Sequence, residues 1–219
     1  MVGRESFESE LKHIEQLIIG LAKKTKEQLK LAVKALYECD VKRAREIIQN
    51  DKDLDKLDLQ INEEAVVLIA RQQPVATDLR RLIVALRISS DLERMADNAK
   101  NIAKSTTHLG ENHGITVHPS IKEMEAIASD MIDLAIRAYE NEDISLARKL
   151  AELDDILDNM YSTMLRELLE VTATEPESIQ HVMQMAFSGR YVERIGDHAT
   201  NIGEDVTYLV KGKSLDLNL

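Results

Sequence analysis

The chain has 219 residues, a formal net charge of −11 and one cysteine, Cys39. Its acidity argues against a nucleic-acid partner, because phosphate backbones bind concentrated basic surfaces, and one cysteine excludes an internal disulfide and a thiolate metal cluster. No stretch approaches the roughly 18 consecutive apolar residues of a membrane-spanning helix, and the first residues lack the features of a signal peptide. We therefore expect a cytoplasmic protein that is not inserted in a membrane.

Helix-forming patterns begin near the amino terminus, and only three prolines and eight glycines interrupt the chain. Apolar residues spaced alternately four and three apart from Phe7 to Leu36 predict a first long helix. After a break near residues 38–41, a second apolar stripe predicts another helix, which Pro74 ends. Such a composition is typical of an all-helical protein.

The third predicted helix should begin at Thr77 or Asp78, both good N-capping residue types, and continue to about Thr107. Glycines and a proline then interrupt the periodicity, and we interpret His108, His113 and His118 of this segment as solvated linker residues. The second half repeats the plan, with helices predicted over residues 119–141, 144–171 and 176–211.

An internal repeat relates the two halves. ERMADNAKNI at Glu93–Ile102 recurs 100 residues later as ERIGDHATNI at Glu193–Ile202, with six of ten positions identical. Residues 31–55 align on residues 134–158 without gaps. Three helices joined by short connections favour an antiparallel bundle. The sequence thus predicts an all-α fold of two tandem three-helix bundles related by a pseudo-twofold axis. The expected domains are residues 1–108 and 121–219, joined by a linker at 109–120.

Paired carboxylates are the chemical signal of the repeat. Each copy of the motif places a glutamate and an aspartate at i and i+4, on one helix face. In the preceding helix, Asp51 and Asp58 stand where the seam expects apolar residues, and Asp154 and Asp158 correspond to Asp51 and Asp55. A buried carboxylate costs several kcal/mol unless it is neutralised, paired or bound to metal. Something must therefore compensate for these acids.

Two interpretations follow. In the conservative one, which spacing alone favours, Arg94 and Arg194 pair with acids of the neighbouring helix, and Arg45 and Arg148 do likewise. In the other, the carboxylates hold a hard cation, and oxygen-only ligation favours magnesium, manganese, calcium or iron over zinc. The basic segment Arg80–Arg87 is expected to pair with neighbouring acids or a partner protein.

The duplicated E-R-x-x-D-x-x-x-N-I segments in a six-helix chain, with residues 71–94 before the first, resemble the PhoU family over almost the whole length. The resemblance implies a cytoplasmic negative regulator of high-affinity phosphate uptake and phosphate-starvation signalling. Its implied partners are the ATPase subunit of the phosphate ABC transporter and the phosphate-sensing histidine kinase. The motif residues that the resemblance associates with metal are Glu93, Asp97, Glu193 and Asp197; the repeat and seam argument adds Asp51, Asp55, Asp154 and Asp158.

Other functions remain open at this point. A carboxylate di-iron oxidase or iron store would need paired Glu-x-x-His segments, and the chain offers a single one at Glu10–His13. A metal-free helical adaptor is equally compatible with the composition, and exposed bundle faces could support a homodimer. No nucleophile has a base at a suitable spacing, so we do not expect an enzyme.

Overall fold

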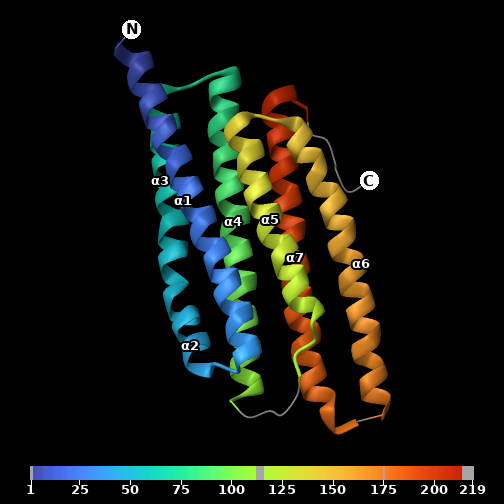
Figure 1. Cartoon of the computed structure of the whole chain (residues 1–219). Helices are drawn as coiled ribbons and strands as arrows, with labels where there is room; N and C mark the ends of the chain where they lie inside the picture. Colours follow the sequence, from blue (N-terminus) through green and yellow to red (C-terminus); the bar gives the residue numbers. More distant parts are fainter. Residues whose placement is uncertain (1, 112–115, 175, 214–219) are drawn as a thin grey trace.

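The computed structural model describes residues 2–111, 116–174 and 176–213, and these form helices and short connections without a β-strand. No helix in these ranges has an apolar stretch long enough to cross a bilayer. Two groups of long antiparallel helices lie side by side (Figure 1). The predicted fold class, two tandem three-helix bundles, is confirmed.

The first repeat differs from its prediction in one element. The second predicted helix is divided at Asp51, where the Leu54 amide donates to the Asp51 carbonyl at 2.9 Å, a tighter turn than the i to i+4 pattern. The Asp51 amide still donates to Ile47, so the path of the helix continues. The helices of this repeat are α1 (Val2–Glu38), α2 (Val41–Asn50), α3 (Lys52–Gln72) and α4 (Ala76–Leu109).

The second repeat follows its prediction closely. A 3-10 turn at Pro176–Ser178 precedes its last helix, which Gly212 ends at a φ of 70°, in the left-handed region that glycine adopts easily. Its helices are α5 (Ser120–Asn141), α6 (Ile144–Thr174) and α7 (Ile179–Lys211).

The two bundles share one hydrophobic core. Helix α4 packs on α7, and α1 packs on α5, so the middle of the molecule contains helices from both repeats. Ile18 and Leu92 of the first repeat and Ile132 and Ile195 of the second belong to a single buried cluster. Because the apolar stripes of both repeats end in the same core, each bundle stabilises the other.

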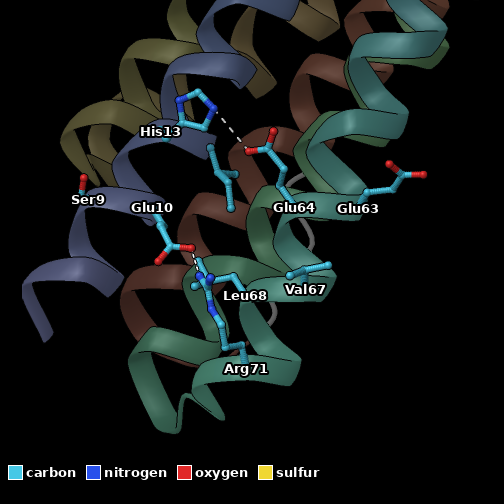
Figure 2. A pocket seen from close by; sticks show the side chains of 9 residues that line it. Ser9, Glu10, His13, Glu63, Glu64, Val67, Leu68 and Arg71 are labelled. Carbon is cyan, nitrogen blue, oxygen red and sulfur yellow. Dashed lines mark hydrogen bonds and ion pairs between the residues drawn. The ribbon is translucent and has the colours of Figure 1, made fainter. Parts of the chain in front are cut away.

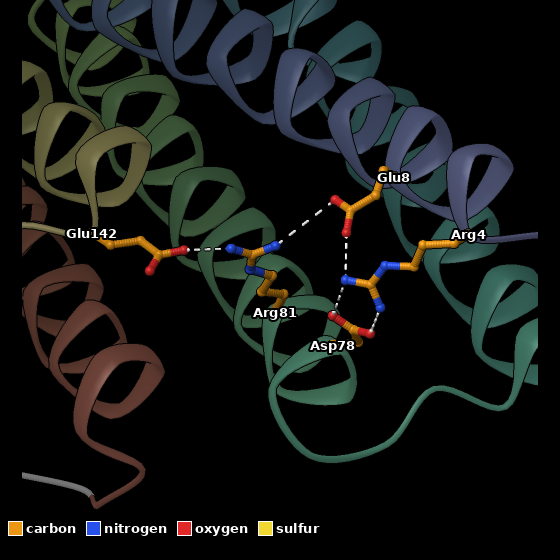
Figure 3. A network of polar contacts seen from close by, with 5 residues as sticks. All are labelled: Arg4, Glu8, Asp78, Arg81 and Glu142. Atoms are coloured by element: carbon orange, nitrogen blue, oxygen red, sulfur yellow. Dashed lines mark hydrogen bonds and ion pairs between the residues drawn. The ribbon is translucent and has the colours of Figure 1, made fainter. Parts of the chain in front are cut away.

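A network of ion pairs joins the repeats at one end (Figure 3). Arg81 on α4 contacts Glu142, just after α5, at 3.1 Å and Glu8 on α1 at 3.9 Å. Arg4 contacts Glu8 and Asp78, each at 2.5 Å. Arg81 and, with Asp205 at 2.9 Å, Arg87 therefore pair with neighbouring acids, as one of the two alternatives for the segment 80–87 predicts, whereas Arg80 donates to the Leu209 carbonyl at 3.1 Å.

Two local expectations need correction. Helix α4 begins at Ala76, and Asp78 pairs with Arg4 in place of capping the helix. His118 is not a solvated linker residue, because its Nε2 lies 2.8 Å from Glu167. His113 falls outside the described residues.

Candidate metal centre

Two acidic clusters lie where the second and third helices of each repeat meet. Helices α2 and α3 pack on α4, and α6 packs on α7, as the placement of the carboxylates requires. The first cluster is Asp51, Asp55, Glu93 and Asp97, and the second cluster is Asp154, Asp158, Glu193 and Asp197.

The second cluster brings three carboxylates together. Asp158, Glu193 and Asp197 each offer one oxygen, and these oxygens lie within 4.8 Å of one another. Hard cations bind oxygen ligands at about 2.0–2.6 Å, so this span suits one shared ion. Asp158 is exposed and Glu193 is buried, so one side of the cluster is open to solvent.

Two oxygens of the second cluster are buried without a hydrogen-bond partner, Glu193 Oε2 and Asp154 Oδ1. Glu193 is only 5% exposed and Asp154 only 7%. The other oxygen of Glu193 accepts a hydrogen bond from Arg190. A buried charge that lacks a partner is costly, so these two side chains are the strongest sign that the cluster holds something besides protein.

The pKa values of these acids also indicate negative charge that the protein does not fully compensate. Burial, with the neighbouring charge of Asp197, raises the pKa of Glu193 to about 7. Burial and the same neighbour raise the pKa of Asp154 to about 6. Burial also raises the pKa of Asp197 itself, against the opposing effect of Arg190. Each carboxylate would be stabilised by a proton or by a cation.

In the first cluster a lysine supplies the compensation. Lys100 Nζ donates to Asp51 Oδ2 at 2.5 Å and to Asp97 as well. The other oxygen of Asp51 accepts from Gln28 Nε2 at 2.8 Å, so both oxygens of this buried side chain are satisfied. Burial alone would lower the pKa of Lys100, but the hydrogen bonds to Asp51 and Asp97 raise it above its usual value. The ammonium therefore stays charged.

The remaining acids of the first repeat are less constrained. Asp55 is exposed, and Glu93 is half-buried with a pKa raised by burial and by Asp97. Asp58, on the apolar seam, accepts hydrogen bonds from Ser89 Oγ at 2.5 Å and from Asn62 Nδ2 at 3.0 Å.

The cations that contact these clusters are not the predicted ones. Arg94 and Arg194 are exposed, and among the described ion pairs Lys100 and Arg190 are the partners of the cluster acids. The expected pairing by Arg94 and Arg194 is therefore wrong. Sequence reasoning missed Lys100 although it lies within the repeated segment, where the second copy has Thr200.

No histidine in the described part of the chain forms an ion pair with an acid of either cluster. His198, next to Asp197, points to the other side, and its Nδ1 lies 2.9 Å from Asp91 on α4. His13 lines a hollow of about 680 Å³ between α1 and α3, where its Nε2 lies 3.4 Å from Glu64 (Figure 2). Glu10 contacts Arg71 in the same hollow. The single Glu-x-x-His segment thus lies apart from the acidic clusters, and nothing in this arrangement favours a di-iron oxidase.

Comparison with known proteins identifies the family. The model of the PhoU domain matches residues 18–106 and again residues 121–206. The chain belongs to the PhoU family. The two matched segments correspond to the two repeats, so each bundle carries one PhoU domain, and each acidic cluster lies within one match.

Relatives of similar length carry the PhoU name. The phosphate-specific transport system accessory protein PhoU homolog of Clostridium acetobutylicum is 33% identical over 98% of this chain and 99% of its own length. The homolog from Aquifex aeolicus is 35% identical over 93% of this chain and 92% of its own length.

Solved PhoU structures share the fold. The crystal structure of PhoU from Pseudomonas aeruginosa matches with a TM-score of 0.89 and 32% identity over 94% of this chain and 100% of that one. The phosphate transport system regulatory protein PhoU from Streptococcus pneumoniae matches with a TM-score of 0.89 and 29% identity over 96% of this chain and 99% of that one. These relatives are named as accessory or regulatory proteins and not as enzymes, in agreement with the expectation from sequence.

Proposed function

We propose that this chain is a cytoplasmic negative regulator of high-affinity phosphate uptake and of phosphate-starvation signalling. The observation that carries the proposal is the match of both repeats to the PhoU domain, in a chain similar over nearly its full length to accessory proteins of the phosphate-specific transport system.

The proposed partners are the ATPase subunit of the phosphate ABC transporter and the phosphate-sensing histidine kinase. Exposed apolar side chains support a docking role, because such groups on a protein surface often mark interaction sites. Val66 and Val67 on α3 are more than half exposed, and Met183 and Phe187 on α7 are 47% and 43% exposed. One of these faces could also support the homodimer.

We further propose that this chain binds metal through acidic residues of its repeats, for which the candidate ligands are Glu93, Asp97, Glu193, Asp197, Asp51, Asp55, Asp154 and Asp158. The unpartnered buried oxygens of Glu193 and Asp154 fit a cation, and a donor set of carboxylates alone suits magnesium, manganese, calcium or iron. A bound cation would supply positive charge that offsets the repulsion between the acids. The carboxylates would then hold α6 against α7 and fix the surface that a partner meets.

Deletion of the gene in its own organism tests the regulatory proposal. Without this chain, a phosphate-starvation reporter should stay active at high phosphate, because the restraint on signalling is lost. Restoring the wild-type gene should return repression. Repression that persists after deletion would overturn the proposal.

Affinity capture tests the partners. The purified full chain should retain the transporter ATPase subunit or the kinase at high phosphate and retain less at low phosphate. M183S/F187S and V66S/V67S are matched variants on the two exposed faces, and loss of capture in one of them locates the docking face. Equal capture by both variants and by wild type would exclude these faces.

A further inference from the structure

The two acidic clusters are built on the same plan but differ at several aligned positions, one of which has Arg190 in the second repeat and Ser90 in the first. With the offset of 103 residues, Gln28 of the first repeat corresponds to Met131. With the offset of 100 residues, Lys100 corresponds to Thr200, and Ala96 corresponds to Gly196. The first repeat thus has two nitrogen donors that the second repeat lacks.

The consequence is clearest at the aspartates that begin each cluster. Asp51 receives hydrogen bonds on both oxygens, from Gln28 and from Lys100. Asp154 occupies the matching position and is equally buried, but its Oδ1 has no partner. The Thr200 hydroxyl donates to the Gly196 carbonyl at 3.2 Å and carries no charge. Among the described ion pairs, the second repeat therefore has no counterpart of the Lys100 ammonium at this aspartate.

Arg190 does not replace that counter-ion. Its guanidinium contacts one oxygen of Glu193 and stacks over the Tyr161 ring at 5.9 Å, with almost half of its side chain exposed. Glu193 Oε2 stays buried without a hydrogen-bond partner, and one oxygen of Glu193 lies within 4.8 Å of oxygens from Asp158 and Asp197. The spacing of these oxygens would allow one cation to contact all three carboxylates.

We propose that the second cluster is the cation site of this chain, and that the Lys100 ammonium takes the place of the cation in the first cluster. This inference rests on the metal binding proposed above and narrows the eight candidate ligands to those of the second repeat. Lys100 bridges Asp51 and Asp97, on two different helices, as a metal ion would.

A dissolved cation competes poorly with this tethered charge. To bind Asp51 and Asp97, it would have to displace an ammonium that is attached to the same helix as Asp97 and cannot diffuse away. The displaced ammonium would remain close and repel the cation. No such competitor bridges two carboxylates of the second cluster among the described ion pairs.

Titration of the metal-stripped full chain with Mn²⁺, followed by calorimetry, tests the inference. E193Q/D197N and E93Q/D97N are matched variants that neutralise the same two motif positions in either repeat. E193Q/D197N should weaken binding by at least about tenfold. E93Q/D97N should leave both the stoichiometry and the affinity of wild type unchanged.

K100T, which gives the first repeat the residue found in the second, completes the set. It should add Mn²⁺ binding that disappears when E93Q/D97N is combined with it. Its thermal unfolding midpoint should fall when a chelator is present and recover with Mn²⁺. A cooperative unfolding transition in chelator would show that K100T still folds. The lower midpoint could then be attributed to loss of the Lys100 ion pairs.

The outcomes separate this inference from the proposal on which it rests. If E93Q/D97N halves the bound Mn²⁺, both repeats bind metal and only the role of Lys100 is overturned. If wild type and every variant bind no Mn²⁺ or Fe²⁺, the proposed metal binding falls together with this inference. Regulation of phosphate uptake would still stand on the deletion experiment.

Discussion

The first and second clusters compare two solutions to one problem, a buried aspartate between packed helices. In the first repeat Gln28 and Lys100 satisfy Asp51 within the chain, whereas in the second repeat Asp154 keeps an unpartnered oxygen. The helices are arranged alike in both, although a tighter turn at Asp51 divides α2 from α3 and α6 is continuous at Asp154. Exchanges at a few side chains after duplication therefore decide whether a cluster is closed by the protein or left for a ligand.

The largest expected difference in the free energy of unfolding is between variants that lack Asp51 and variants that lack Asp154. D51A should lower the free energy of unfolding by about 2–4 kcal/mol, because it leaves Gln28 and Lys100 without their buried acceptor. D154A should change it by less than about 1 kcal/mol in chelator, because the carboxylate that it removes has one unpartnered oxygen and is repelled by Asp197 and Asp158, which offsets the loss of its hydrogen bond with Thr200. Urea unfolding of both variants measures the difference, and equal losses would contradict it.

Exchange of the small residues beside the aspartates should come next. In G196A the new Cβ would lie 2.6 Å from Leu157 Cδ2 and 3.1 Å from Asp154 Oδ1, so the buried leucine must shift. We expect a loss of about 1–3 kcal/mol from overpacking. The matched exchange A96G should cost about 1 kcal/mol through helix propensity alone. If denaturant unfolding gives G196A the stability of wild type, Leu157 repacks freely.

The pH dependence should differ between wild type and E193Q. The pKa of Glu193 in the folded chain is about 7, above its usual 4.5, so the folded state holds the proton more tightly than the unfolded state. This contribution to stability is complete below pH 4.5 and is lost as the pH rises through about 7. In chelator, wild type should lose roughly 1–2 kcal/mol more than E193Q over this range, allowing for solvent screening. Parallel pH profiles would show that Glu193 is not the group responsible.

An exposed ion pair gives the smallest expected effect and serves as a control for the first cluster. Lys26 Nζ lies 2.5 Å from Asp133, the distance that separates Lys100 from Asp51, but the Asp133 side chain is 54% exposed and that of Asp51 only 3%. K26M should therefore cost less than about 1 kcal/mol. A loss as large as that of D51A would mean that distance, and not burial, decides the strength of these pairs.

Much of the fold could be predicted from the sequence. The helices follow from apolar periodicity, which predicts that residues such as Ile18 and Leu92 are buried. Both are fully buried in the structure. The duplication was visible in the letters of the motif. The break at Asp51 was not predictable, because the apolar pattern continues through it and the tighter turn changes the path of the backbone only slightly.

The site was predictable in part. Spacing placed Glu193 and Asp197 on one helix face, and the structure brings Asp158 from the neighbouring helix to them. The partners of Asp51 were missed because Gln28 lies on α1 and Lys100 on α4, and nothing local relates either residue to the start of α3. Comparison of Lys100 with Thr200 in the aligned repeats was the one available signal.

The sequence by itself determined the helices, their duplication and the faces on which the acids lie, because these depend on periodicity along one chain. Only the tertiary structure decided which acids are neutralised. Compensation of a buried charge depends on distances of a few ångströms between side chains from different helices, and Lys100 reaches Asp51 only once α4 has packed on α2 and α3.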